Sequence, residues 1–229
     1  MIDDYDWPGG REAMLRFGPA TGPVVIAAMP LFEEANHTRA FIVTILRALA
    51  ERGVASALPD LPGTGESLIE TEEISLNIWQ KAFSCAAKAL KGDHGPPHGI
   101  AFRGGALFDS TAPLASRWHF APVAGESLVR DMLRTRLAAG KAGDAIDPTG
   151  PVIELAGNRL SHVLLAELER ATPSSAPPLR VVRLDTDTLS ADRRIAGPPL
   201  WRRTEPGNDQ ALARQLADDI AAWIATCAA

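Results

Sequence analysis

The chain has 229 residues, of which 46% are hydrophobic and 22% are charged, and this suits one α/β domain with a full hydrophobic core. Its net charge of −5 and its scattered Lys and Arg side chains form no basic stripe, which argues against a nucleic-acid partner. The first ten residues lack the pattern of a secretory signal, and no apolar run reaches the about 20 residues of a transmembrane helix. We therefore expect a cytoplasmic protein with no membrane span.

Short apolar runs alternate with amphipathic segments along the chain. The run 23–30 is bounded by prolines, as expected for a strand that is covered on both faces. The segment after it places Phe41, Ile45 and Leu49 at helical spacing and stops at Gly53. In chain order, the pattern predicts strands over 23–30, 54–60, 98–103, 116–122 and 179–185, and helices over 36–53, 76–92, 106–115 and 209–225. This alternation predicts an α/β fold with a mainly parallel central sheet flanked by helices.

The alternation breaks over residues 125–172. This stretch holds two helical segments, a link rich in Gly, Asp and Pro, and a possible hairpin over 150–160. It is too long for an ordinary crossover between two strands. We therefore predict one domain over 1–229, in which residues 125–172 form a small cap above the carboxyl ends of the strands, where open α/β sheets bind ligands.

Residues 101–105, with the sequence AFRGG, have the frame of a nucleophile elbow. In the G-x-S-x-G elbow, a strand, a sharp turn with small residues and a helix lift a serine above the sheet. Here the small residues remain, but Arg103 takes the place of the serine. An arginine cannot act as the nucleophile because its guanidinium group stays protonated at any working pH.

A hydrolase with such an elbow also needs a histidine late in the chain as the base. Every histidine precedes the strand that ends at Asp185; the five are His37, His94, His98, His119 and His162. Asp185 and Asp187 lie where an orienting acid could be, but with no histidine to orient they are typical of a strand-end turn or helix cap. The usual triad is therefore absent from the sequence.

No other motif indicates a cofactor or a metal. The segment 60–67, DLPGTGES, lacks the third glycine of a dinucleotide fingerprint, and no P-loop or zinc-protease motif occurs, so we interpret it as a tight loop beside the site. Cys85 and Cys227 have the spacing of neither a disulfide framework nor a zinc site and are expected to be buried and reduced. Ser67 and Cys85 are the remaining nucleophiles, and we interpret both as structural.

The order of six segments resembles the exosortase A system-associated hydrolase 2 family, a branch of the α/β-hydrolase superfamily. These segments are PLFEEANHTRAF, LPDLPGTGES, GIAFRGGAL, GESLVRDMLRTRLAAG, ELAGNRLS and PLWRRTEP. The resemblance implies that Pro30, Leu31 and Phe32 form an oxyanion-hole loop, that Gly104 supplies a backbone N–H group to it, and that Asp185 has the acid position. It also implies an exopolysaccharide-related setting in bacteria. Residues 201–210, where a catalytic histidine would be sought, contain Arg202, Arg203, Thr204, Glu205 and Asn208 instead.

Two interpretations of Arg103 carry equal weight. Its guanidinium group, together with the N–H groups of Gly104 and Gly105 at a helix start, would bind a carboxylate or phosphate. Alternatively, Glu33 or Glu34 would pair with Arg103 as a structural ion pair. The two are compatible if a ligand competes for the arginine.

The helix start beside this loop supplies the other candidate groups. If the protein is catalytic, Arg103 would stabilise developing negative charge and Glu34 or His37 would be the base. The alternative for His37 is a solvated histidine at the helix start, where Asn36 or Thr38 would be the N-cap.

The sequence thus predicts an α/β-hydrolase-like protein that has lost the Ser-His-Asp triad. We expect it to bind a small anionic or acyl molecule, or to bind and transform it, without a cofactor. The alternative hypothesis is a non-catalytic binding or assembly protein that kept the fold.

Overall fold

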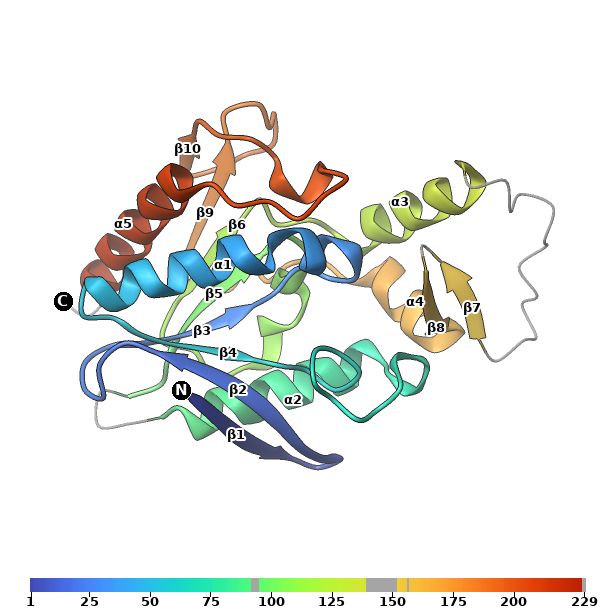
Figure 1. Ribbon diagram of the computed structural model, residues 1–229, viewed down its shortest axis with the longest axis horizontal. Helices are drawn as coiled ribbons and strands as arrows, with labels where there is room; N and C mark the ends of the chain where they lie inside the picture. The colour runs from blue at the N-terminus through green and yellow to red at the C-terminus, as the bar shows by residue number, and fades with distance from the viewer. Residues whose placement is uncertain (92–94, 139–151, 156, 228–229) are drawn as a thin grey trace.

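An eight-stranded sheet runs through the computed structural model, which describes residues 1–91, 95–138, 152–155 and 157–227 (Figure 1). The strand order is β1-β2-β4-β3-β5-β6-β9-β10. The strands are β1 (Ile2–Trp7), β2 (Gly10–Phe17), β3 (Val24–Ala28), β4 (Ala55–Pro59), β5 (His98–Phe102), β6 (Arg117–Phe120), β9 (Leu179–Leu184) and β10 (Arg193–Ile195). β1 and β2 are antiparallel to their neighbours, whereas β4, β3, β5, β6, β9 and β10 are parallel to one another. The predicted α/β class with a mainly parallel sheet is confirmed.

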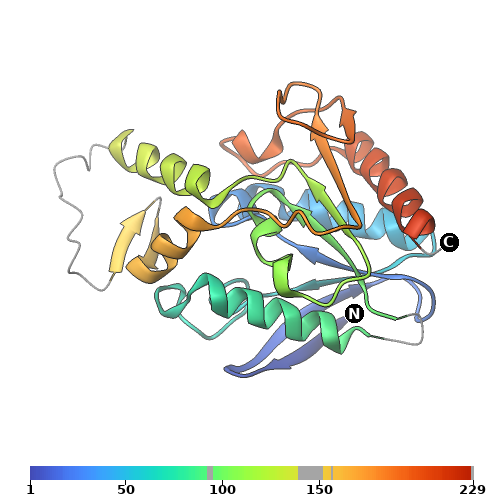
Figure 2. The same cartoon turned by 180° about the vertical axis from the view of Figure 1, so that it is seen from behind.

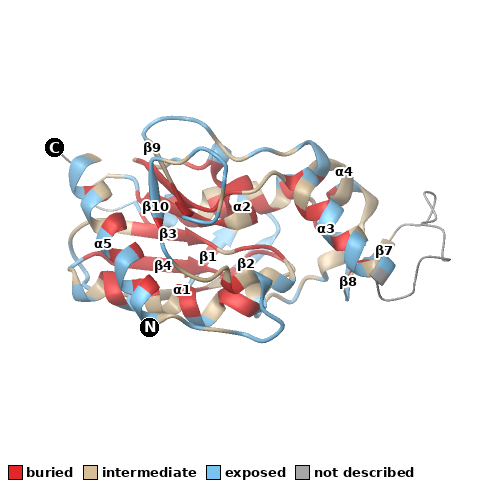
Figure 3. Cartoon of the chain, turned by 90° about the horizontal axis from the view of Figure 1, so that it is seen from above, coloured by how far each residue is buried: buried red, intermediate tan, exposed pale blue. Residues whose placement is uncertain are grey.

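Helices cover both faces of this sheet (Figures 1 and 2). One face carries α1 (Glu33–Glu51) and α5 (Gln210–Cys227), and the other carries α2 (Leu76–Ala89). Along β3 the side chains alternate between the two cores: Val25 and Ala27 pack with α1 and α5, whereas Ile26 and Ala28 pack with α2. Figure 3 shows the buried residues along the strands and on the helix faces turned toward them. A strand buried on both faces explains why the predicted run 23–30 is continuously apolar.

The elements that the sequence pattern missed are at the two edges of the sheet. β1 and β2 form an N-terminal hairpin in which acidic residues face solvent, and only Tyr5, Glu12 and Met14 are buried. β10 has three residues, of which Ile195 alone is buried. Edge strands with so few apolar positions give no run that a pattern search can detect.

The segment after β5 also differs from its prediction. Instead of one helix over 106–115, the chain forms two short 3₁₀-helices, η2 (Arg103–Leu107) and η3 (Asp109–Thr111). A third 3₁₀-helix, η1 (Thr71–Glu73), precedes α2, and a fourth, η5 (Leu200–Arg202), follows β10. A 3₁₀-helix of this length has poorer hydrogen-bond geometry and a weaker aligned dipole than an α-helix.

Residues between β6 and β9 extend beyond the sheet at the end toward which β3 points (Figures 1 and 2). They form α3 (Gly125–Ala138), the antiparallel pair β7 (Val152–Leu155) and β8 (Asn158–Ser161), and α4 (His162–Arg170). The predicted hairpin is therefore present, although residues 139–151 and 156 of the predicted cap lie outside the described residues. That this segment acts as a cap stays a prediction.

Asp219 of α5 is buried and connects the helix to three strands. Its carboxylate accepts hydrogen bonds from the Trp118 indole at 2.8 Å, from Arg180 at 2.8 and 2.9 Å, and from Arg193 at 2.6 Å. Burial acts to raise the pKa of the Asp219 carboxyl, but the hydrogen bonds from Arg180, Trp118 and Arg193 outweigh burial and hold the pKa below its usual value. The carboxylate therefore holds the carboxyl-terminal helix against β6, β9 and β10.

Candidate functional site

The elbow geometry is present although the serine is not. Arg103 directly follows β5 and has a φ of 53°, in the left-handed region that a non-glycine residue rarely adopts. Such a conformation costs about 1–3 kcal/mol and persists where the surroundings impose it. Here they do, because a Cβ atom on Gly105 would lie 2.4 Å from the carbonyl oxygen of Ala28 and 2.5 Å from that of Met29. The backbone after the elbow is therefore pressed against the loop that follows β3.

The Arg103 side chain is held by a carboxylate, a carbonyl and an aromatic ring. Its Nε donates to both carboxylate oxygens of Glu34 at 3.2 Å, and its Nη2 donates to Oε1 at 2.8 Å. Its Nη1 donates to the carbonyl oxygen of Ala121 at 3.3 Å, and the guanidinium carbon lies 4.7 Å from the ring centroid of Trp201. The predicted ion pair is confirmed, with Glu34 as the partner.

Glu33 takes a different direction. Its side chain is 60% exposed, and its Oε1 lies 3.6 Å from Nε2 of His37 rather than near Arg103. His37 is buried, and its Nδ1 lies 3.5 Å from the carbonyl oxygen of Trp201. The expectation of a solvated histidine at this position is therefore wrong.

The reason is that α1 begins three residues earlier than predicted. Phe32 is its N-cap, with a φ of 56° and no side-chain capping bond, and Glu33 and Glu34 occupy the first turn, where acidic groups interact favourably with the helix dipole. Asn36 and Thr38 lie inside the helix and do not cap it; the Thr38 hydroxyl donates to the carbonyl oxygen of Glu34 at 2.7 Å. One extra turn moves His37 from the mouth of the helix to its buried side.

The predicted oxyanion residues adjoin one another. A Cβ atom on Gly104 would lie 3.3 Å from Cδ1 of Leu31 and 2.7 Å from Cδ1 of Leu128, so the β3 loop and α3 both contact the elbow. The expected helix start at Gly104 and Gly105 belongs to the five-residue 3₁₀-helix η2, which weakens the predicted anion site made of helix N–H groups. An anion at this place would depend mainly on the Arg103 guanidinium.

The strand-end acids at Asp185 and Asp187 form hydrogen bonds around the end of β9. Asp185 is exposed at the end of β9, where its backbone N–H group donates to the carbonyl oxygen of Ile195 at 3.0 Å. Asp187 accepts hydrogen bonds from Arg183 at 2.8 Å and from the backbone N–H group of Leu189 at 2.9 Å. Asp187 thus has the structural turn role that the sequence offered as an alternative.

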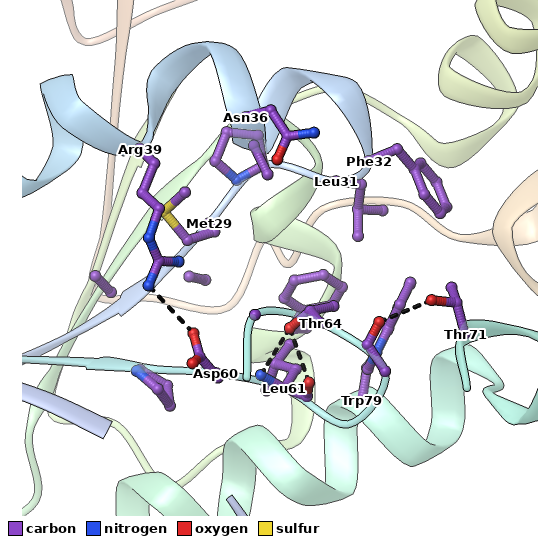
Figure 4. A pocket seen from close by; sticks show the side chains of 18 of the residues that line it. Met29, Leu31, Phe32, Asn36, Arg39, Asp60, Leu61, Thr64, Thr71 and Trp79 are labelled. Atoms are coloured by element: carbon purple, nitrogen blue, oxygen red, sulfur yellow. Dashed lines mark hydrogen bonds and ion pairs between the residues drawn. The ribbon is translucent and has the colours of Figure 1, made fainter. Parts of the chain in front are cut away.

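Two cavities open on either side of the Leu31–Phe32 turn. The smaller, of about 190 Å³, is lined by Arg103, Glu34 and Trp201 together with residues of α3. The larger, of about 320 Å³, is lined by the loop after β3, the first turns of α1, the loop after β4 and α2 (Figure 4). Residues 60–67 form a loop, as expected, but they line the larger cavity and not the cavity of Arg103 beside which they were predicted. No sequence motif indicated the larger cavity.

The remaining nucleophiles and histidines have structural environments. The Ser67 hydroxyl donates to Glu12 at 3.1 Å and accepts from the backbone of Gly63 at 3.0 Å. Cys85 and Cys227 are free and only half-buried, not fully buried as expected. His98 and His119 are buried in the sheet, and His94 lies outside the described residues; burial lowers the pKa of His98.

Within the described ranges, no three His, Cys, Asp or Glu side chains are placed to hold a metal ion. No helix in the same ranges is long and apolar enough to cross a membrane.

Comparison with known proteins identifies the fold. No protein-family model and no curated protein matches the chain. Among solved structures, it is similar to alpha/beta hydrolase domain-containing protein 10 from mouse, with 14% identity, a TM-score of 0.67 and 99% of each chain covered. It is also similar to Est1E from Butyrivibrio proteoclasticus with ferulic acid bound, with 15% identity, a TM-score of 0.61, and 97% of this chain and 99% of that one covered.

A third similar structure is the bottromycin epimerase BotH in complex with bottromycin A2, with 14% identity, a TM-score of 0.57, and 95% of this chain and 98% of that one covered. At such identities the likeness shows that this chain has the α/β-hydrolase fold and says nothing about its reaction. The resemblance to the exosortase-associated family stays a prediction.

Proposed function

We propose that this protein binds a small molecule with a carboxylate or acyl group in the cavity beside Arg103, and that it carries out no Ser-His-Asp hydrolysis. The observation that supports this proposal is Arg103 itself. It occupies the left-handed elbow position and lines a cavity of about 190 Å³. Backbone strain retained at a cleft is a common mark of a functional position.

The guanidinium group has capacity left for a ligand. It carries five N–H groups, and its contacts with described residues use the one on Nε, one on Nη1 and one on Nη2. Glu34 takes the edge formed by Nε and Nη2, which leaves one N–H group each on Nη1 and Nη2 for a carboxylate. A carboxylate that bonds to these two N–H groups would also weaken the ion pair between Glu34 and Arg103, because both anions compete for one cation.

We infer that this chain lacks the nucleophile and the base of a serine hydrolase. Arg103 cannot be the nucleophile, and no histidine follows His162 in the sequence. The two residues considered as a base are also engaged: Glu34 binds Arg103, and His37 lies between Glu33 and Trp201 and lines neither cavity. Two neighbours of this fold are described as Est1E with ferulic acid bound and as the bottromycin epimerase BotH, so the fold itself is compatible with binding without hydrolysis.

The setting of this binding is proposed from the sequence resemblance. We place the protein in the bacterial cytoplasm, in an exopolysaccharide-related system, and assign residues 125–172 as the cap over the cavity. Arg103, Leu31 and Phe32 would contact the ligand head, because all three line the smaller cavity. Gly104 and Asp185 line neither cavity and would have no contact with the ligand.

Substitution of Arg103 by glutamine is expected to lower the affinity for hexanoate at least tenfold, because a charge-assisted hydrogen-bonded contact is lost. Glu34→Gln removes the competing anion and is expected to raise the affinity several-fold. Glu51→Gln is the matched control, since the exposed Glu51 lies at the other end of α1 and lines neither cavity. Isothermal titration of each folded variant measures these affinities.

Assays with a panel of acyl esters and thioesters complete the test. Neither the wild type nor Arg103→Ser is expected to turn over above background, because a serine at the elbow has no base. Wild-type turnover that disappears in Arg103→Ala would contradict the proposal and indicate a rewired enzyme. Hexanoate binding that is unchanged in Arg103→Gln, or absent throughout, would refute it and favour the non-catalytic assembly protein.

A further inference from the structure

The larger cavity is separate from the cavity of Arg103. It lies between the first turns of α1 and the loop after β4, with α2 below it (Figure 4). Leu31 and Phe32 form its boundary with the smaller cavity, and Arg103 is outside its lining. Its volume of about 320 Å³ is at the lower end of the range for small-molecule sites.

One side of this cavity is aromatic and firmly held. The rings of Phe32 and Trp79 lie 6.1 Å apart at 57°, and those of Trp79 and Phe108 lie 5.5 Å apart at 64°. The Trp79 indole N–H donates to the carbonyl oxygen of Pro62 at 2.8 Å, which fixes the ring. Trp79 and Phe108 are each 1% exposed and support the half-buried Phe32, whose ring presents an apolar surface for stacking or edge-to-face contact.

The opposite side carries one cation and one anion next to each other. Nη2 of Arg39 lies 3.5 Å from Oδ1 of Asp60, and Oδ2 of Asp60 accepts from the backbone N–H group of Glu66 at 3.3 Å. Figure 4 shows both side chains at the same edge of the cavity. Ion pairs and charge-assisted bonds at full strength are about 2.7–2.9 Å long, so both contacts are long.

The position of Asp60 makes these long contacts significant. Its side chain is 9% exposed, whereas that of Arg39 is 43% exposed. A carboxylate has about four acceptor sites, and burial penalises those that lack a donor. A ligand that supplies a donor to Asp60 and an acceptor to Arg39 on neighbouring atoms would satisfy both groups together.

We propose that this cavity is a second ligand site, which takes a neutral molecule with a carboxamide group on a flat apolar body. The amide oxygen accepts from Arg39, the amide N–H donates to Asp60, and the flat body lies against the half-buried ring of Phe32. A carboxylate in the same place would face Asp60, and a cation would face Arg39. The site therefore disfavours both the carboxylate and the cation and accepts the neutral carboxamide of the same shape.

Three probes of nearly the same shape test the proposal: benzamide, benzoate and benzamidine. NMR chemical-shift titration of the full chain is expected to show saturable binding of benzamide at this cavity. The two ions are expected to bind at least tenfold more weakly. Absence of saturable benzamide shifts, or equal affinity for the three probes, would overturn the proposal.

Substitutions test which side chains bind benzamide. Arg39→Met and Asp60→Asn are each expected to lower the affinity for benzamide at least tenfold, whereas Arg47→Met, an exposed position on the same helix, leaves it unchanged. If Asp60→Asn fails to fold, the half-exposed Arg39 carries the test alone. Arg103→Gln is expected to leave benzamide binding intact, which separates this site from the proposed carboxylate site. Equal losses in Arg39→Met and Arg47→Met would refute the assignment.

Discussion

Substitution of Gly105 by alanine is expected to lower the free energy of unfolding by about 3 kcal/mol or more. The added Cβ atom would lie 2.4 Å from the carbonyl oxygen of Ala28 and 2.5 Å from that of Met29. Both are backbone atoms at the end of β3, which is paired on either side within the sheet. Overpacking costs about 1–3 kcal/mol even where side chains can adjust, and here the backbone itself must move.

Gly104→Ala is the matched control for this substitution. Its Cβ atom would meet Leu128 at 2.7 Å and Leu31 at 3.3 Å, both at the ends of flexible side chains. The expected loss is therefore smaller, about 1 kcal/mol. Urea denaturation of the two variants measures the difference, and equal losses would show that the close approach at Gly105 is not a constraint.

Substitution of Asp219 by asparagine is expected to lower the free energy of unfolding by about 2–4 kcal/mol. Removal of one partner from a buried ion pair costs about 3–5 kcal/mol. The value is discounted here because the side chains of Arg180 and Arg193 are 27% and 44% exposed and thus partly screened. The control is Asp218→Asn, whose carboxylate is 65% exposed and pairs with Arg52, so its expected change is below about 1 kcal/mol.

Acid denaturation gives a second measurement of the contribution of Asp219 to stability. Because the folded-state pKa of Asp219 lies below its ordinary value of 3.8, the unfolded chain binds the proton first as pH falls. The contribution of Asp219 to stability is therefore fully present above about pH 4 and is lost as pH falls through the folded-state pKa. Asp219→Asn is expected to lose this part of the acid dependence while Asp218→Asn retains it. Identical acid dependence in both variants would contradict the assignment.

The parts of the fold that alternate strictly were predictable from the sequence. β3, β4 and β5 are mostly apolar, because a parallel strand in the middle of the sheet is buried on both faces. β6 and β9 contain arginine and histidine and were predicted from their place in the alternation of strands and helices. The hairpin of β1 and β2 was not predictable in this way, since its buried side chains are few and acidic residues separate them. Its place in the sheet depends on pairing with β4, which is a tertiary contact.

The candidate site was predictable only in part. The sharp turn at Arg103 after a strand was predicted from local sequence, and an ion pair with Glu33 or Glu34 was one of two alternatives for its side chain. The choice of Glu34 over Glu33 depended on where α1 begins, and that was decided by the left-handed turn at Phe32. The larger cavity joins Arg39 and Asp60 from separate elements, so no spacing in the sequence could reveal it.

The contact between Arg103 and Trp201 also has an optical consequence. Indole emission responds to the charge beside the ring, and the guanidinium carbon of Arg103 lies 4.7 Å from the Trp201 ring centroid. Trp79 and Trp118, by contrast, are buried in the two cores on opposite faces of the sheet, where their indole N–H groups donate to the Pro62 carbonyl and to Asp219. A molecule that turns Arg103 away from Trp201 would therefore change the emission of Trp201 and leave the emission of Trp79 and Trp118 unchanged. Trp201 is thus an intrinsic fluorescent reporter of the Arg103 side chain, and no attached dye is needed.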